Sequence, residues 1–353
     1  MSQAAICVVV PVYKAMATLD RCVESVLAQQ VEGGLTCILV DDGSPDESGA
    51  LCDAWAAKDD RVTVIHQDDL GVSGARNSGL AAADSEFIVF LDSDDALRPG
   101  ALQAALTAQR AAPQDFVVWH YTTDEKDPAA VTADAEPRTQ AGLARLWLDC
   151  LLAMPWNKLY RADLAKQLQF DVQYTLGEDL QFVLDYISLL GQTVPEFGYR
   201  VMTSPLTFYD CSRGGTLSTR YHANYCDIWP KHFAKLNAAC HAAACPAEDM
   251  RPLHRAELQV FAEGVADIMR RDPSPTQRLK GYKAEAALRS PWLRALLERM
   301  KIEHCYSAYY LPCRWRNVGL VCRVDEARRA NAPLYGKLDW AGYYLLLGRM
   351  RRD

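Results

Sequence analysis

Residues 87–91, Phe-Ile-Val-Phe-Leu, run directly into residues 92–95, Asp-Ser-Asp-Asp. Five apolar residues without a polar break predict a strand that is buried on both faces, as in a parallel sheet. Three carboxylates at the end of such a strand repel one another, because a like-charge pair about 4 Å apart costs roughly 4 kcal/mol at an effective dielectric of about 20. A divalent cation such as Mg²⁺ or Mn²⁺ would remove this repulsion. The alternative is a solvated acidic turn that caps the next helix.

A second acidic pair, Asp41 and Asp42, follows another apolar stretch at residues 37–40. Between the two acidic sites the sequence predicts a helix, a strand and a second helix, at residues 46–58, 62–65 and 71–83. This alternation of strands and helices is typical of a parallel α/β sheet. The carboxyl ends of parallel strands lie at one edge of the sheet, so both acidic clusters are expected to face one cleft.

Length and composition indicate an ordinary globular protein that is long enough for two domains. The chain has 353 residues, of which 50% are hydrophobic and 24% charged. It has no apolar run of 18 residues, and its N-terminus lacks the cationic region of a signal peptide. The twelve cysteines form no Cys-x-x-Cys pair, and Cys7, Cys22, Cys37 and Cys52 are interpreted as core thiols in a reducing compartment. We therefore expect a cytoplasmic protein, and no nucleic-acid partner.

Five motifs occur in a characteristic order along the chain. They are Pro-Val-Tyr at 11–13, Val-Asp-Asp-Gly-Ser at 40–44, Gly-Val-Ser-Gly-Ala-Arg-Asn-Ser-Gly at 71–79, Leu-Asp-Ser-Asp-Asp at 91–95 and Gly-Glu-Asp-Leu-Gln-Phe at 177–182. With these motifs the chain resembles the family 2 inverting glycosyltransferases of bacteria, over roughly residues 4–218. The resemblance implies an α/β fold of the GT-A type in residues 1–218, with a mostly parallel central sheet flanked by helices. Residues 219–353 are expected to form a mainly helical C-terminal region.

On the donor side, the resemblance implies that Pro11 and Tyr13 lie under the nucleotide and that Asp42 accepts a hydrogen bond from the uracil ring. An ionised Asp suits that role because it is acceptor-only and can take the imide N–H. Asp41 or Asp42 could instead form an Asx turn. Arg76 corresponds to an arginine near the base and diphosphate, with an exposed helical arginine as the alternative.

The resemblance also implies a metal site and a catalytic base. Asp94 corresponds to the carboxylate that contacts the ribose and, with Asp95, is expected to hold the Mn²⁺ or Mg²⁺ that bridges the diphosphate. Asp179 corresponds to the base that deprotonates the acceptor hydroxyl as it attacks opposite the diphosphate. Its neighbour Glu178 is the competing candidate. Alternatively, both carboxylates only favour the positive end of the helix that begins near Leu180.

The acceptor side is expected to include Trp156, Lys158 and Glu178. A Trp ring can stack on a sugar, although a buried core Trp is the alternative. Arg213 corresponds to a segment that closes over the donor in relatives. In this chain the family's usual aromatic-and-arginine run is replaced by Asp-Cys-Ser at 210–212, so the role of Arg213 is left open.

The C-terminal residues 289–353 are basic and aromatic, with 13 Lys and Arg against 6 Asp and Glu. Cationic and aromatic side chains together suit contact with an anionic membrane, which would place the protein at the inner face of the cell membrane. The alternative is a helical region that packs its aromatic residues on the catalytic core.

Together these features predict a metal-dependent inverting glycosyltransferase. It would move a hexose or N-acetylhexosamine from a UDP-sugar to a saccharide or lipid-linked saccharide acceptor, in the synthesis of capsule, exopolysaccharide or lipopolysaccharide. The alternatives are a non-catalytic sugar- or nucleotide-binding relative and a sugar nucleotidyltransferase. The second of these would carry a glycine-rich N-terminal loop, which residues 11–14, Pro-Val-Tyr-Lys, lack.

Overall fold

A computed structural model of the chain describes residues 3–174, 176–212 and 220–331. It divides into two compact units, Met1–Gly214 and Gly215–Asp353, here called unit 1 and unit 2. Arg213, Tyr335, Trp340, Tyr343 and Tyr344, which the sequence singled out, lie outside the described residues.

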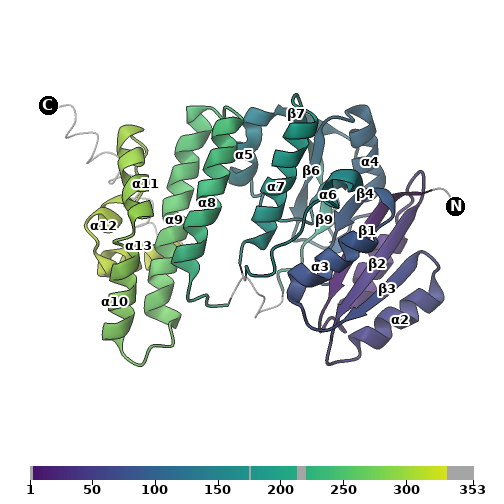
Figure 1. Cartoon of the computed structure of the whole chain (residues 1–353), viewed down its shortest axis with the longest axis horizontal. Coiled ribbons are helices and arrows are strands. Elements are labelled where there is room, and N and C mark those ends of the chain that lie inside the picture. The colour runs from purple at the N-terminus through teal and green to yellow at the C-terminus, as the bar shows by residue number, and fades with distance from the viewer. Residues whose placement is uncertain (1–2, 175, 213–219, 332–353) are drawn as a thin grey trace. The chain divides into compact units, whose positions relative to one another are not determined.

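Unit 1 begins with a parallel sheet formed by the strands that the sequence predicted (Figure 1). The strands pair in the order β3-β2-β1-β4. Their bounds are β1 (Ala4–Val12), β2 (Leu35–Asp42), β3 (Val62–Gln67) and β4 (Ser85–Phe90). The connecting helices are α1 (Leu19–Leu27), α2 (Ser48–Lys58) and α3 (Gly71–Ala82). The uninterrupted apolar runs of β1, β2 and β4 are almost wholly buried, because helices cover this part of the sheet.

The second half of the sheet is mixed rather than parallel. Strand β8 (Lys158–Arg161) pairs antiparallel with both β4 and β6 (Phe116–Thr122), and β9 (Gly198–Phe208) pairs parallel with β6. Two short strands, β5 (Ala96–Leu97) and β7 (Ala135–Thr139), pair antiparallel with β9. The remaining helices are α4 (Ala101–Ala111), the 3-10 turn η1 (Gln140–Gly142), α5 (Leu143–Leu148), α6 (Ala162–Ala165) and α7 (Glu178–Thr193). The expected α/β fold with a flanked central sheet is therefore confirmed.

Unit 2 is helical throughout its described residues. Its helices are α8 (Tyr225–Ala242), α9 (Ala247–Arg271), α10 (Gln277–Ala287), α11 (Pro291–Ile302), α12 (Tyr310–Arg314) and α13 (Val318–Arg329). The long helix α9 lies at the centre and packs against α8, α10, α11 and α13. The apolar core includes Phe261 and Val265 from α9, Leu296 from α11 and Val321 from α13. Across the described ranges, no helix combines the length and the apolar composition that a bilayer span requires.

All twelve cysteines lie in the described ranges and are free thiols. Cys7, Cys22, Cys37 and Cys52 are buried among the strands and helices of unit 1. This confirms the interpretation of these four as small core residues.

Candidate active site

The carboxyl ends of β2, β1 and β4 bring the predicted donor-side residues to one edge of the sheet. Strand β1 lies between the other two. Asp42 ends β2, Pro11 is the penultimate residue of β1, and the acidic segment 92–95 follows β4 directly. Tyr13, one residue beyond β1, is 44% exposed, whereas Pro11 is buried. The two acidic sites therefore share one sheet edge, and an open tyrosine ring lies beyond the strand between them.

The two carboxylates at the end of β2 have different hydrogen-bond partners. Asp42 Oδ1 accepts from Gln67 Nε2 at 2.6 Å and from the Leu70 amide at 2.9 Å. Asp41 Oδ1 accepts from the Ser44 amide, three residues on, at 3.2 Å. Asp41 therefore stabilises the turn after β2 without forming an Asx turn, and Asp42 is held by the last residue of β3 and by Leu70 beyond it.

The turn after β2 requires the glycine that the sequence places there. Gly43 has a φ of +68°, and a Cβ at this position would lie 3.1 Å from the backbone nitrogen of Asp69. A side chain would meet both a steric clash and an unfavourable backbone conformation. His66 Nδ1 lies 3.0 Å from Asp41 Oδ2 and completes the packing of this turn.

Asp95 is the most unusual carboxylate of the site. It is fully buried, and its Oδ1 accepts from the Asp210 amide at 3.0 Å. Its Oδ2 is also buried and has no hydrogen-bond partner among the residues that the structure describes. Burial, followed by the nearby charge of Asp92, raises the pKa of Asp95 to about 9. An orphaned carboxylate oxygen among further carboxylates is a donor set that fits a hard divalent cation.

Arg21, on α1, limits the negative charge around this acidic segment. Its Nη2 donates to the Asp94 carbonyl at 2.6 Å and to Asp210 Oδ2 at 2.7 Å. Hydrogen bonds from Ser212 and Arg21 lower the pKa of Asp210 to about 2. Asp210 therefore stays ionised and, through its amide, holds the buried Asp95.

Arg76, on α3, connects the acidic segment to the predicted base. Its Nη1 donates to Asp179 Oδ1 at 2.6 Å and its Nη2 to Asp92 Oδ1 at 2.8 Å. The guanidinium carbon lies 5.4 Å from the centroid of the Phe170 ring. Arg76 is only 3% exposed, so the alternative of an exposed helical arginine is wrong. The prediction that Arg76 contacts the donor also does not fit, because its guanidinium is buried and bonded to two carboxylates.

Asp179 and Glu178 are the first two residues of α7, where the helix dipole favours negative charge. The Asp179 side chain is 29% exposed. Burial raises the pKa of Asp179 to about 7. The nearby charge of Arg76 lowers this pKa, whereas the charges of Glu178 and Asp92 raise it. A carboxylate with this pKa can accept a proton near neutral pH.

The prediction that Lys158 binds the acceptor is wrong. Lys158 is fully buried in β8, and its Nζ donates to the Leu151 and Met154 carbonyls and to Asn157 Oδ1, at 2.7, 2.5 and 2.5 Å. Burial holds the pKa of Lys158 well below its usual range. Its three donors are used by internal oxygens, so the ammonium fastens the chain before β8.

Trp156 corresponds to the buried alternative and is 3% exposed. Its ring stacks on Tyr209 with 5.4 Å between ring centroids and meets Tyr121 edge-on at 5.3 Å. An open sugar platform at Trp156 itself does not fit this position. Tyr209, the other member of the stacked pair, is half-buried and therefore more accessible than Trp156.

The family model of glycosyl transferase family 2 matches residues 7–169. This range contains most of β1, all of β2 to β8, and the site residues described above except Phe170, Glu178, Asp179 and residues 209–212. Unit 1 is a family 2 glycosyltransferase domain.

Curated relatives match the family 2 domain only over part of their length. Glycosyltransferase GlyG of Streptococcus pneumoniae is 39% identical over 124 residues, which are 35% of this chain and 41% of GlyG. The succinoglycan biosynthesis protein ExoO of Rhizobium meliloti is 31% identical over 211 residues, 54% of this chain and 58% of ExoO. The chain spans about half the length of the curated relatives it matches.

A likeness among solved structures extends beyond the family 2 domain. The crystal structure of S. aureus TarS residues 1–349 in complex with UDP-GlcNAc has a TM-score of 0.61 to this chain. It covers 93% of this chain and 92% of the TarS chain at 17% identity. At this identity the likeness establishes the shared GT-A architecture and nothing finer.

Sequence reasoning missed two polar residues of the family 2 domain, Arg21 and Asp210. They lie 189 positions apart and meet only because α1 and the end of β9 converge beside the acidic segment. Nothing in the local sequence of α1 distinguishes Arg21 from a solvated helical arginine. The departure from the family pattern at 210–212 was visible, but it did not reveal that the Asp210 amide would hold Asp95.

Proposed function

We propose that the chain is a metal-dependent inverting glycosyltransferase of cell-surface polysaccharide synthesis. It transfers a hexose or N-acetylhexosamine from a UDP-sugar to a saccharide or lipid-linked saccharide. The observation that carries this proposal is the Arg76 bridge, which links the Asp179 carboxylate to Asp92 in the acidic segment 92–95. The role of ExoO in succinoglycan biosynthesis and the binding of UDP-GlcNAc by TarS support the pathway and the donor.

The proposed nucleotide site uses the sheet edge at β1, β2 and β4. The oxygen Asp42 Oδ1 already accepts from Gln67 and Leu70, so the uracil imide N–H would bond to Oδ2. Tyr13, two residues beyond Pro11, offers an exposed ring for the base or ribose, and Asp94, in the segment after β4, would contact the ribose hydroxyls.

Asp95 and Asp94 would hold Mn²⁺ or Mg²⁺. The fit rests on the buried Asp95 Oδ2, which has no hydrogen-bond partner in the described ranges and whose ionised form needs a nearby positive charge. When bound, the metal would neutralise the charge that develops on the departing diphosphate. Arg21 binds the Asp210 side chain, and the Asp210 amide binds Asp95 Oδ1. These contacts keep the Asp95 carboxylate from rotating into solvent.

Asp179 would act as the base, with Arg76 as a positioning residue. Arg76 takes Oδ1, so a proton from the acceptor hydroxyl would go to Oδ2. The second Arg76 contact, to Asp92, fixes the base relative to the acidic segment. An inverting transfer needs one base on the face opposite the leaving diphosphate, and one carboxylate suffices because the nucleotide is already a good leaving group.

Donor and metal binding can be measured together by thermal shift. We expect one UDP-sugar to raise the melting temperature with Mn²⁺ and to have much less effect in a chelator, because the diphosphate and Asp95 share the ion. A ligand at about 100 times its Kd adds roughly 2.7 kcal/mol of stability. GDP-mannose is the matched control that tests whether the uracil base is recognised. Equal shifts with and without Mn²⁺ would contradict metal dependence, and no shift with any UDP compound would contradict the donor.

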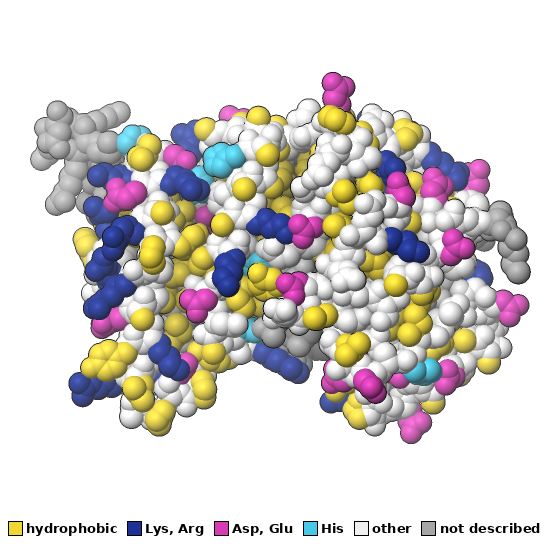
Figure 2. All heavy atoms as spheres, viewed as in Figure 1, with side chains coloured by type: hydrophobic (Ala, Val, Ile, Leu, Met, Phe, Trp, Pro, Cys, Tyr) yellow, Lys and Arg dark blue, Asp and Glu magenta, His cyan; other side chains and the backbone are white. Residues whose placement is uncertain are grey.

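Unit 2 carries a basic surface that suits an anionic membrane. Figure 2 shows Lys and Arg side chains gathered over α10, α11 and α12. A small pocket beside α11 is lined by four arginines, Arg289, Arg294, Arg314 and Arg316. Trp315, between the last two, is 63% exposed. Tyr306, Tyr309 and Tyr310 are instead buried in the core of unit 2, so the predicted aromatic group divides into core and surface members.

We expect this basic surface to bind vesicles that contain anionic lipid, which would hold the enzyme at the inner face of the membrane. Each arginine near such a surface contributes about 1 kcal/mol, so Arg294→Gln with Arg316→Gln should weaken binding roughly 30-fold in co-sedimentation. Lys58→Gln with Lys126→Gln in unit 1 removes the same charge elsewhere and is the control. Equal binding by both double variants would contradict the proposal. Truncation near residue 288 is unsuitable, because α11 and α13 supply much of the unit 2 core.

A further inference from the structure

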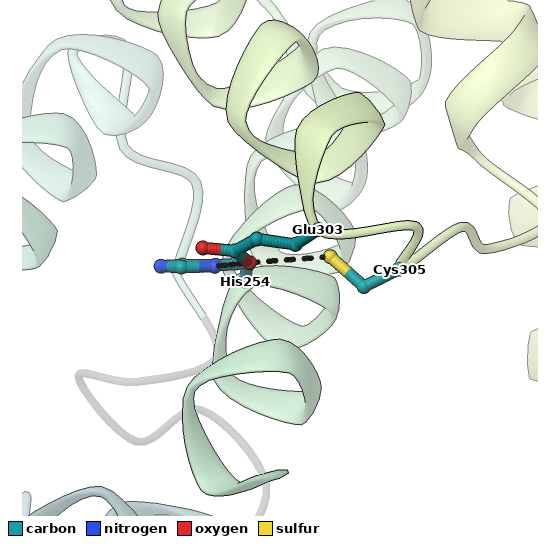
Figure 3. A group of neighbouring side chains, drawn as sticks. All are labelled: His254, Glu303 and Cys305. Carbon is teal, nitrogen blue, oxygen red and sulfur yellow. Dashed lines mark hydrogen bonds and ion pairs between the residues drawn. The ribbon is translucent and has the colours of Figure 1, made fainter. Parts of the chain in front are cut away.

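Three potential metal ligands meet in unit 2, and none of them belongs to the proposed transferase site. They are His254, Glu303 and Cys305, and Figure 3 shows their side chains pointing toward one another. His254 Nδ1 lies 2.6 Å from Glu303 Oε2, and Cys305 Sγ lies 3.6 Å from the same oxygen. One potential ligand atom from each residue lies within 4.8 Å of the other two. His254 is 1% and Cys305 4% exposed, whereas the Glu303 side chain is 29% exposed and leaves an approach from solvent.

The end of α11 is shaped so that Glu303 and Cys305 face His254 together. His304, between them, has a φ of +53°, in the left-handed region that a non-glycine residue seldom adopts. The Cys305 amide donates to the Met300 carbonyl at 3.0 Å and closes a Schellman-type helix end. This reversal turns both side chains toward α9, which carries His254.

A neighbouring amide orients the imidazole. Asn237 Nδ2 donates to the Phe233 carbonyl at 2.8 Å and to Glu257 Oε1 at 2.6 Å, so Asn237 Oδ1 must be the atom that faces His254 Nε2, at 3.2 Å. An acceptor at this distance assigns the proton to Nε2, and the Nδ1 lone pair then faces the Glu303 carboxylate. A metal-binding histidine is oriented in this way, with its outer N–H donated to an oxygen.

Without a cation, this arrangement would set two acceptors against each other at 2.6 Å. The other tautomer avoids that contact, since Nδ1–H donates to Glu303 and Nε2 accepts from Arg299 Nη1 at 3.3 Å. It would, however, direct the Nε2 lone pair at the fixed oxygen of Asn237. A metal ion between the three side chains removes both conflicts, as a second proton on the imidazole would, and the Cys305 thiol beside them is the further ligand that favours the metal.

We propose that His254 Nδ1, Glu303 and Cys305 Sγ bind one divalent transition-metal ion, with Zn²⁺ the best match and water in the fourth position. Zn²⁺ prefers four ligands in a tetrahedral arrangement and accepts nitrogen, oxygen and sulfur together. Mg²⁺ and Ca²⁺ bind oxygen ligands alone. Binding releases the Cys305 thiol proton to solvent, and the thiolate and carboxylate balance the charge of the ion. The ion ties α9 to the segment between α11 and α12, and this site is independent of the transferase chemistry.

The test uses Co²⁺ as a spectroscopic substitute for Zn²⁺ on the full-length protein after chelation. We expect a thiolate-to-cobalt charge-transfer band that saturates at one equivalent and disappears when Zn²⁺ is added. The band should be absent in Cys305→Ser and unchanged in Cys322→Ser, a matched control on α13. No band in the parent protein, or an equal band in Cys305→Ser, would overturn the proposal.

A second measurement keeps the proposal testable if Cys305→Ser fails to fold. Glu303→Gln changes a half-exposed side chain and keeps the thiolate, so the band should remain but saturate at higher Co²⁺. Asn237→Ala removes the orienting amide and should weaken Co²⁺ binding about 10–100-fold. Unchanged affinity in both variants would mean that the cluster is an ordinary buried His–Glu pair.

Discussion

Replacing Asp179 with asparagine is expected to lower kcat for sugar transfer by about 10²–10⁴-fold, the usual contribution of a general base. Asparagine cannot accept the acceptor's proton, but its Oδ1 can still accept from Arg76, so the buried guanidinium keeps a partner. UDP binding should be nearly unchanged, because the proposed nucleotide contacts are residues at the ends of β1, β2 and β4. Steady-state rates at saturating donor, with calorimetric titration of UDP, measure the two effects separately.

The pH dependence of the parent enzyme tests the same assignment. Burial raises the pKa of Asp179 to about 7, so the base is increasingly protonated, and inactive, as the pH falls below that value. The ratio kcat/KM, which reports groups of the free enzyme, should therefore decline on the acid side of about pH 7, and the residual activity of Asp179→Asn should lack this step. Glu178→Gln is the matched control at the adjacent position. A larger loss in the control, or near-normal turnover in Asp179→Asn, would move the base to Glu178.

The first half of the sheet could be predicted because its signals are local. The strands β1, β2 and β4 are apolar runs without alternation, which occur where helices cover both faces of a parallel sheet. The rule that carboxyl ends of parallel strands share an edge then placed Asp42 and the 92–95 segment together. The second half gave weaker signals: β8 has four residues and β5 has two, and their pairing depends on partners far along the chain.

The side-chain partners within the site could not be predicted, because they depend on tertiary packing. Arg76 reaches Asp179 across 103 positions, and its burial beneath two carboxylates reverses the usual expectation of an exposed helical arginine. Lys158 was assigned to the acceptor side because residues 156–158 resemble the segment that lines the acceptor side in relatives, and such a resemblance does not show whether a side chain is buried. The burial of Lys158 is tolerated because internal oxygens accept all three of its donors, and no sequence rule reveals this.

Replacing Asp95 with asparagine is expected to stabilise the metal-free protein while removing metal-dependent donor binding. The native pKa of Asp95 is raised to about 9 from 3.8, so between these values the folded protein holds a proton that the unfolded chain releases. Stability due to this residue therefore falls as the pH rises from about 4 to about 9. Asparagine removes that cost and can still accept from the Asp210 amide. After the cost of burying the new amide group, a net gain of about 1–2 kcal/mol at pH 7 would raise the melting temperature by roughly 2–8 °C.

The gain in stability and the loss of binding must appear in the same variant for the assignment to hold. Thermal melts without metal should show a difference between Asp95→Asn and the parent that is small at pH 4 and grows toward pH 9. With Mn²⁺ and the UDP-sugar, the parent should gain stability and the variant should not, because the ion has lost its buried ligand. Asp60→Asn removes an exposed carboxylate and should change neither quantity. A stability difference that does not vary with pH would show that burial does not raise the pKa of Asp95. Undiminished Mn²⁺-dependent binding in the variant would place the ion on other carboxylates, because loss of Asp95 Oδ2, which has no partner among the described residues, should weaken the binding of an ion that it holds.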